Sequence, residues 1–176
     1  MVSPFEIVQL AAGRVFGSRL VTNNSRGLIA EAIVATVLCP EWRWCSEDYH
    51  RCDFTHPSGA QLEVKQSAAC QSWPSKAPTV ARWDVGARKG YWEGETYVAQ
   101  PGRNAEIYVL AWHPVADREQ ADHRDPAQWH FYVVQADALP PVKTLGMAGV
   151  AALATPVRVD QLASIVSNAL FKCGRR

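Results

Sequence analysis

The spacing of apolar residues predicts two helices in the N-terminal part of the chain. Ser3 and Glu6 form a capping box around Pro4, which predicts a helix that ends near Gly17. A second helix, entered through a short polar segment, is expected over residues 26–38. Almost all of its residues are apolar or small, so most of its surface should be buried.

The C-terminal segment has the same helical period. Five apolar residues recur there at helical spacing, namely Leu162, Ile165, Val166, Ala169 and Leu170. Asp160 is expected to cap this helix and Gly174 to end it. The pattern predicts an amphipathic helix that packs its apolar face on the rest of the fold.

Strand-like segments lie between these helices. Residues 42–46 and 52–68 are short β-type stretches, and residues 105–112 and 129–134 are apolar runs that we expect to be interior strands. Residues 67–104 are rich in Gly, Pro, Trp and charge and have no clear period. We expect a long, partly irregular excursion there, and such excursions in compact domains are usually functional or mobile.

The segment 52–68 is expected to be a tight hairpin with a three-residue loop. Pro57 suits the first central position of a type I turn, and Gly59 suits the left-handed position that follows. This loop would pair residue 56 with residue 60, and therefore Asp53 with Glu63.

The hairpin register decides which side chains share a face. Because side chains alternate along a strand, Phe54, Leu62 and Val64 should lie on a core face. The other face would then carry Asp53, Glu63 and Lys65. Two facing carboxylates destabilise a sheet unless positive charge lies between them. A divalent cation is one candidate for that charge.

The whole-chain composition restricts the classes of function. The 176 residues fit a single domain, 1–176, and 18 basic residues against 17 acidic ones exclude a histone-like or tail-driven nucleic-acid binder. Any contact with nucleic acid must therefore come from a local patch. Five cysteines with no CxxC pair, and no leader-like segment, favour a reduced cytoplasmic protein. No apolar run approaches the ~20 residues of a membrane span.

Glu31 interrupts the apolar second helix. An ionised glutamate in a mostly buried helix costs several kcal/mol unless a cation or a donor lies nearby. One interpretation places Glu31 on a solvated stripe or beside Arg26. The other places it near the cation expected between Asp53 and Glu63.

A helical Glu31, a strand Asp53 and, after nine intervening residues, Glu63-Val64-Lys65 together resemble the PD-(D/E)xK nuclease superfamily. Cys52 stands where the family name has proline, but that proline is often absent among relatives. By motif the resemblance covers roughly residues 20–70, and the later elements match by pattern only. It implies an α/β protein with a restriction endonuclease-like core, in which helices flank a central mixed sheet.

The resemblance also implies an activity, namely Mg²⁺-dependent hydrolysis of phosphodiester bonds. DNA is the expected substrate and RNA the alternative, in a restriction, repair or mobile-element setting. Asp53, Glu63 and the carbonyl of Val64 would hold Mg²⁺, for which Mn²⁺ could substitute, and Glu31 would complete or extend the site. Lys65 would orient the attacking water or stabilise the pentacovalent phosphorus. Gln66 is a candidate accessory residue without an assigned role.

Residues 81–92 mix basic and aromatic side chains. The members expected to contact nucleic acid are Arg82, Trp83, Arg88 and Lys89, with Tyr91 and Trp92 nearby. Such a mixture suits phosphate contact and base stacking. In the alternative interpretation the aromatic residues anchor a long loop on the core and the basic residues are only solvated.

Two further alternatives stay open at this point. Zinc could bind Cys45, His50, Cys52 and His56, although their spacing fits no known finger and alternation places Cys52 on the core face with Phe54. The chain could instead be a non-catalytic nucleic-acid or protein-interaction domain that kept the fold. Many relatives of the family act as dimers, so the resemblance also allows a homodimer.

Overall fold

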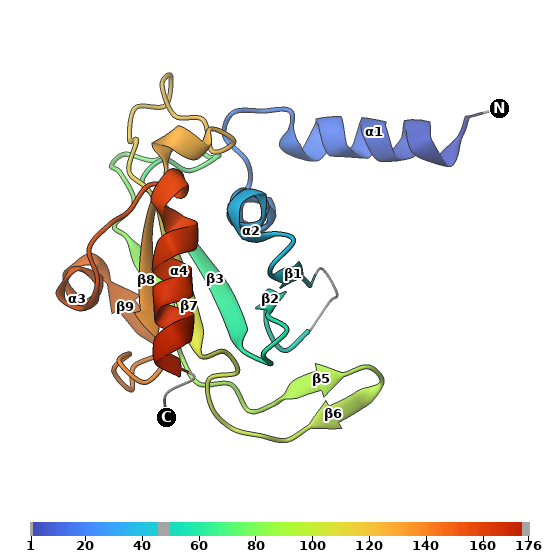
Figure 1. The fold of residues 1–176 in the computed structure, drawn as a ribbon. Helices are drawn as coiled ribbons and strands as arrows, with labels where there is room; N and C mark the ends of the chain where they lie inside the picture. The colour runs from blue at the N-terminus through green and yellow to red at the C-terminus, as the bar shows by residue number, and fades with distance from the viewer. Residues whose placement is uncertain (1, 46–49, 174–176) are drawn as a thin grey trace.

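The computed structural model describes residues 2–45 and 50–173, and its centre is a five-stranded sheet with the order β1-β2-β3-β7-β8 (Figure 1). The strands are β1 (Arg43–Trp44), β2 (Phe54–Thr55), β3 (Gln61–Ala68), β7 (Ile107–His113) and β8 (His130–Gln135). β3 and β7 are parallel, and the other neighbouring pairs are antiparallel. The sheet is therefore mixed, as the sequence predicts.

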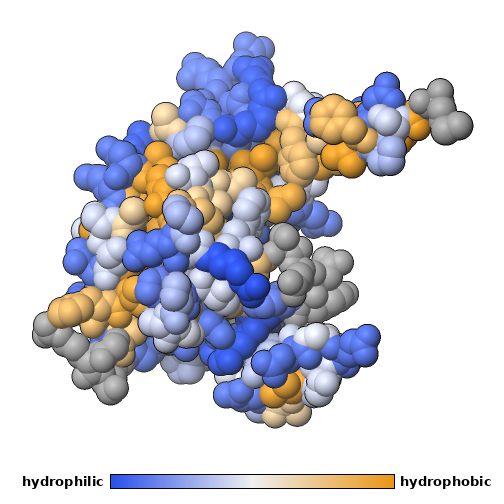
Figure 2. Space-filling view, turned by 45° about the vertical axis from the view of Figure 1, so that its right-hand side comes forward, coloured by the Kyte–Doolittle hydropathy of each residue, from blue (hydrophilic) through white to orange (hydrophobic). Residues whose placement is uncertain are grey.

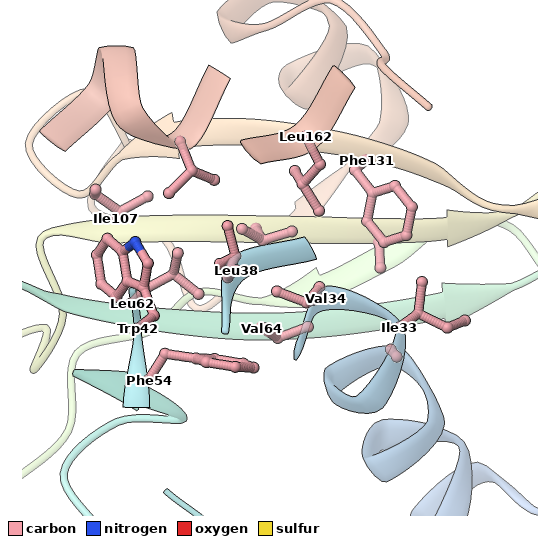
Figure 3. Close-up of a cluster of buried hydrophobic side chains, with 14 of the residues drawn as sticks. Ile33, Val34, Leu38, Trp42, Phe54, Leu62, Val64, Ile107, Phe131 and Leu162 are labelled. Carbon is pink, nitrogen blue, oxygen red and sulfur yellow. The ribbon is translucent and has the colours of Figure 1, made fainter. Parts of the chain in front are cut away.

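Two helices cover one face of this sheet, α2 (Asn23–Leu38) and α4 (Val159–Cys173) (Figure 1). Their apolar side chains meet those of the central strands in a buried cluster (Figure 3) that includes Val34, Leu38, Leu62, Val109, Phe131 and Leu162. The cluster contains the alternate residues of β3 and β7, so the polar residues between them face the other side.

The opposite face carries a second buried cluster. It is covered by β4 (Arg82–Asp84), which pairs with β9 (Thr144–Gly146), and by α3 (Met147–Leu153). Its members include Trp83, Tyr108, Leu110, Tyr132, Leu145 and Val150. A separate hairpin of β5 (Tyr91–Glu93) and β6 (Thr96–Val98) extends from the same excursion, and η1 (Pro126–Gln128) precedes β8.

The first helix, α1 (Pro4–Phe16), projects away from the body and buries none of its residues (Figures 1 and 2). The expected capping box is present, because the backbone N of Glu6 donates to Ser3 Oγ over 3.2 Å and Gly17 caps the other end. In the described part of the chain, no helix is both long enough and apolar enough to cross a membrane.

Most of the expected elements are present, with two corrections and several omissions. Asp160 does not cap the last helix, because that helix already begins at Val159 and Asp160 lies in its first turn. Gly174, expected to end this helix, and residue 46 of the first β-type stretch lie outside the described residues. The sequence analysis did not anticipate α3 or the short strands β4, β5, β6 and β9. All five cysteines are free.

The hairpin has the predicted register. Phe54 pairs with Leu62, and the backbone N of His56 donates to the carbonyl of Ala60 over 2.9 Å. Gly59 has a φ of 88°, the left-handed conformation expected of it. One detail was wrong, because Cys52 is buried in the second cluster with Trp83 and Tyr108 instead of sharing the core face of Phe54.

Gly59→Ala should destabilise the protein by about 1–2 kcal/mol, since an L-residue at this φ is strained although no atom lies within 4 Å of the added Cβ. Gly27→Ala is the matched control, because a Cβ at Gly27, inside α2, also meets no atom within 4 Å. This variant should be more stable than the wild type by about 0.5–1 kcal/mol. Urea unfolding of both variants measures the difference. Equal stability of Gly59→Ala and the wild type would contradict the turn conformation described here.

Candidate active site

The edge of β3 brings three of the predicted residues together. The pairing of β2 with β3 ends at Phe54 and Leu62, and Asp53 is the residue that directly precedes Phe54. Asp53 Oδ2 accepts a hydrogen bond of 2.6 Å from the backbone N of Val64. Lys65 Nζ forms an ion pair with Glu63 Oε1. Both side chains lie on the face of β3 opposite that of Leu62 and Val64. The local turn and the alternation of β3 are thus sufficient to assemble this group.

Glu31 reaches the same group from α2. Its Oε2 accepts a hydrogen bond of 3.0 Å from Trp44 Nε1. Burial raises the pKa of the Glu31 carboxyl, while the Trp44 hydrogen bond and the charge of Lys65 lower it. The hydrogen-bond partner of Glu31 is thus Trp44, and the charges of Lys65 and Glu63 also affect its pKa.

The alternative partner of Glu31, Arg26, is engaged elsewhere. Arg26 is only 1% exposed, and its Nε donates to Gln66 Oε1 over 2.7 Å. Its Nη2 donates to the side-chain oxygens of Asn23 and Gln71. Burial lowers the pKa of Arg26 to about 10. Gln66, the candidate accessory residue, thus connects β3 with the beginning of α2.

The carboxyl of Asp53 is hard to ionise in this setting. Burial raises its pKa to about 7, and the charges of Glu63 and Glu31 contribute to the increase. The charge of Lys65 and the hydrogen bond from Val64 oppose it. In the described residues the site therefore carries more negative charge than Lys65 alone can balance.

A cavity of about 280 Å³ opens beside this group. Glu63 and Lys65 line it together with Tyr108, which is opposite Glu63 on β7. Arg88 and Asp84 line another side and form an ion pair of 3.2 Å. The cavity thus combines acidic residues with basic residues that could contact an anionic substrate.

The described residues form neither the predicted zinc site nor a site of three acidic side chains. No three His, Cys, Asp or Glu side chains in the described ranges are grouped in a way that could hold a metal, and this includes Glu31, Asp53 and Glu63. The zinc alternative therefore fails, and His56 instead contacts Ser58 and Glu41. Mg²⁺ keeps several waters and commonly needs only one or two carboxylates, which Asp53 and Glu63 would supply.

The basic stretch is only partly placed as expected. Arg82, Arg88 and Lys89 are exposed, and of these three Arg88 lines the cavity. The prediction for Trp83 was wrong: its side chain is 1% exposed, and its Nε1 donates to the carbonyl of Ala111 over 3.0 Å. A tryptophan packed in this way is not accessible to a base.

Several cavity residues were missed by the sequence analysis, notably Arg51, Asp84, Tyr97 and Tyr108. For Tyr97 a signal exists in the sequence. Residues 91–98 read YWEGETYV, in which aromatic residues flank a central Gly94 with a φ of 59°. This pattern is typical of a hairpin. Arg51, Asp84 and Tyr108 have no comparable local signal.

The chain matches no protein-family model and no curated protein sequence. Among solved structures, that of a bacterial homing endonuclease, I-Ssp6803I, is similar to it, with a TM-score of 0.41 and 18% sequence identity. The similarity covers 71% of this chain and 77% of that chain. The strand order itself defines an α/β fold with a central mixed sheet flanked by helices. A helix, α2, precedes the hairpin, as the restriction endonuclease-like resemblance implies.

Proposed function

We propose that the protein is a Mg²⁺-dependent nuclease that hydrolyses phosphodiester bonds in DNA. The observation that carries this proposal is the placement of Asp53, Glu63 and Lys65 at one edge of β3. A structural role alone would not require two acidic groups there with so little balancing charge.

The residues of β3 have separate roles in this proposal. Asp53 and Glu63 would hold the cation, with the carbonyl of Val64 as a third ligand. The N–H and C=O of one strand residue point to the same side, and the N–H of Val64 donates to Asp53. Glu31 would complete or extend the site from α2. A bound Mg²⁺ would lower the pKa of a coordinated water and offset charge on the phosphate.

Hydrolysis forms one bond and breaks another at the same phosphorus. A water oxygen bonds to phosphorus as the bond to the leaving ester oxygen breaks, and the leaving oxygen gains a proton. One product end is a phosphate and the other a hydroxyl. Lys65, ion-paired to Glu63, is positioned to orient the water or to stabilise the charge at the pentacovalent phosphorus.

A non-catalytic interaction domain is the second candidate function. It would keep the fold without needing the acidic pair. The two candidates are distinguished by incubating the protein with supercoiled, linear duplex and branched DNA, and with RNA, in EDTA, Mg²⁺ or Mn²⁺. The proposal predicts cleavage only with a metal. Intact substrates in every reaction at high protein concentration would favour the second candidate.

Replacing Arg82, Arg88 and Lys89 together by Ala should weaken DNA binding at low salt, because fewer counterions are released from the phosphates. The slope of log affinity against log salt should become shallower by roughly 1 to 3. The exposed residues Arg14, Lys76 and Lys172, replaced together by Ala, are a control with the same change in charge. Fluorescence anisotropy titrations at several salt concentrations give both slopes, and equal slopes would show that the basic stretch does not contact DNA.

A further inference from the structure

The hairpin of β5 and β6 carries two large aromatic side chains that line the same cavity as Glu63 and Lys65. Trp92 and Tyr97 are directly opposite each other, with ring centroids 5.5 Å apart and planes at 62°. Trp92 is 45% exposed and Tyr97 is 47% exposed. The hairpin extends from the body of the protein (Figure 1), so the stability of the core does not explain these rings.

A close backbone approach fixes the position of Tyr97. A Cβ at Gly90 would collide with the carbonyl oxygen of Val98 and with the ring of Tyr97. Only glycine therefore allows the ring to lie against the chain where the hairpin begins. This contact directs the aromatic pair toward the cavity instead of leaving it free to turn.

Positive charge lines the same cavity. The Arg51 guanidinium is 4.7 Å from the centroid of the Tyr91 ring, within the range of a cation–π contact. Arg51 Nε is buried and has no hydrogen-bond partner among the described residues. A phosphate oxygen would satisfy this donor, and Arg88 provides a second cation on the cavity wall.

This combination suits an unpaired nucleotide. In a duplex the bases present only their edges in the grooves, whereas an unpaired base exposes the faces on which aromatic side chains stack. The cavity has a volume of about 280 Å³, just below the usual range for small-ligand pockets.

We propose that Trp92 and Tyr97 form a stacking platform for an unpaired base, and that the preferred substrate is DNA with single-stranded nucleotides at the cleavage site. This proposal rests on the nuclease function proposed above. It narrows the substrate from DNA in general to flaps, gaps, bubbles or branched ends.

The test is the binding of two labelled oligonucleotide duplexes in EDTA, one fully paired and one with a short central bubble. The wild type should bind the bubble more tightly, and Trp92→Ala should lose about 5- to 100-fold in affinity for it. Trp92→Phe should keep most of this affinity because a ring remains. Trp73→Ala is the matched control, since Trp73 is 52% exposed and lines a different cavity.

Equal binding of the two duplexes by the wild type would overturn the proposal. So would an unchanged bubble preference in Trp92→Ala, or an equal loss in Trp92→Phe. Because EDTA removes catalysis from the measurement, the two proposals can fail separately. A bubble preference without cleavage in Mg²⁺ would support the platform and contradict the nuclease. Cleavage without that preference would contradict only the platform.

Discussion

Lys65→Ala should reduce the rate of DNA cleavage by about 100-fold or more while leaving Mg²⁺ affinity nearly unchanged. The expected size is that of removing one group that stabilises charge in a transition state. Lys65 is held by Glu63 at the edge of β3 and lines the cavity. Its charge is therefore next to any phosphate that enters. Single-turnover cleavage and a calorimetric Mg²⁺ titration measure the two quantities.

Lys172→Ala serves as the control for Lys65→Ala, because Lys172 is exposed in the last turn of α4, on the helix that covers the other face of the sheet. Its cleavage rate should equal that of the wild type. Wild-type turnover in Lys65→Ala would contradict the assigned role. A large loss of Mg²⁺ affinity in that variant would instead move Lys65 into the metal site.

Asp53→Asn should abolish cleavage and yet melt, in EDTA, at the wild-type temperature or above it. Substitutions usually destabilise by about 1 kcal/mol. Here the change removes a charge that burial and Glu63 disfavour, and the amide oxygen can still accept the hydrogen bond from Val64. Each unit by which a pKa is raised corresponds to about 1.4 kcal/mol, so the rise of the Asp53 pKa from 3.8 to about 7 corresponds to a gain of about 4 kcal/mol at pH 8.

The gain should depend on pH in a defined direction. The folded pKa of Asp53, about 7, lies above its ordinary value of 3.8. Well below pH 3.8 the carboxyl is protonated in both states and costs nothing. Between pH 3.8 and about 7 the unfolded chain ionises while the folded state still holds the proton, so the wild type loses stability that Asp53→Asn keeps. The difference between the two melting temperatures should grow from about pH 4 to about pH 7 and then stay level.

Magnesium should reverse the comparison. Millimolar Mg²⁺ should raise the wild-type melting temperature, because it binds only the assembled site, and should barely move Asp53→Asn. Asp117→Asn, in an exposed loop, is the control and should respond to Mg²⁺ as the wild type does. If Asp53→Asn melted well below the wild type in EDTA and responded equally to Mg²⁺, Asp53 would be a structural residue.

The arrangement of Asp53, Glu63 and Lys65 was predictable because it depends on local rules. Pro57 and Gly59 determine the turn, the turn determines the register, and the register places Asp53 beside β3. From there, the alternation of side chains along β3 is enough to place Glu63 and Lys65 on one face of the strand. The interior strands were equally accessible to prediction, since continuous apolar runs identify them.

The error at Trp83 and the unexpected environment of Arg26 concern contacts between distant parts of the chain. Trp83 is buried because β4 pairs with β9, about sixty residues later, and no local pattern specifies that pairing. Arg26 was one expected partner of Glu31, yet it bonds to Gln66 and Gln71, whose side-chain oxygens allow its burial. Arg51 and Asp84 reach the cavity for the same kind of reason, because each comes from a segment that only the tertiary fold brings there.

The most direct test of metal-dependent cleavage is the initial rate of DNA cleavage as a function of Mn²⁺ or Mg²⁺ concentration. It is measured for the wild type and for Asp53→Asn under the same conditions. Burial and the charge of Glu63 raise the pKa of Asp53, and a cation bound to both carboxylates would favour their ionised forms. The account predicts no cleavage in EDTA, a saturable rise in rate with metal for the wild type, and no measurable rate for Asp53→Asn at any metal concentration. Cleavage that is independent of metal, or equal metal-dependent rates for the two proteins, would contradict it.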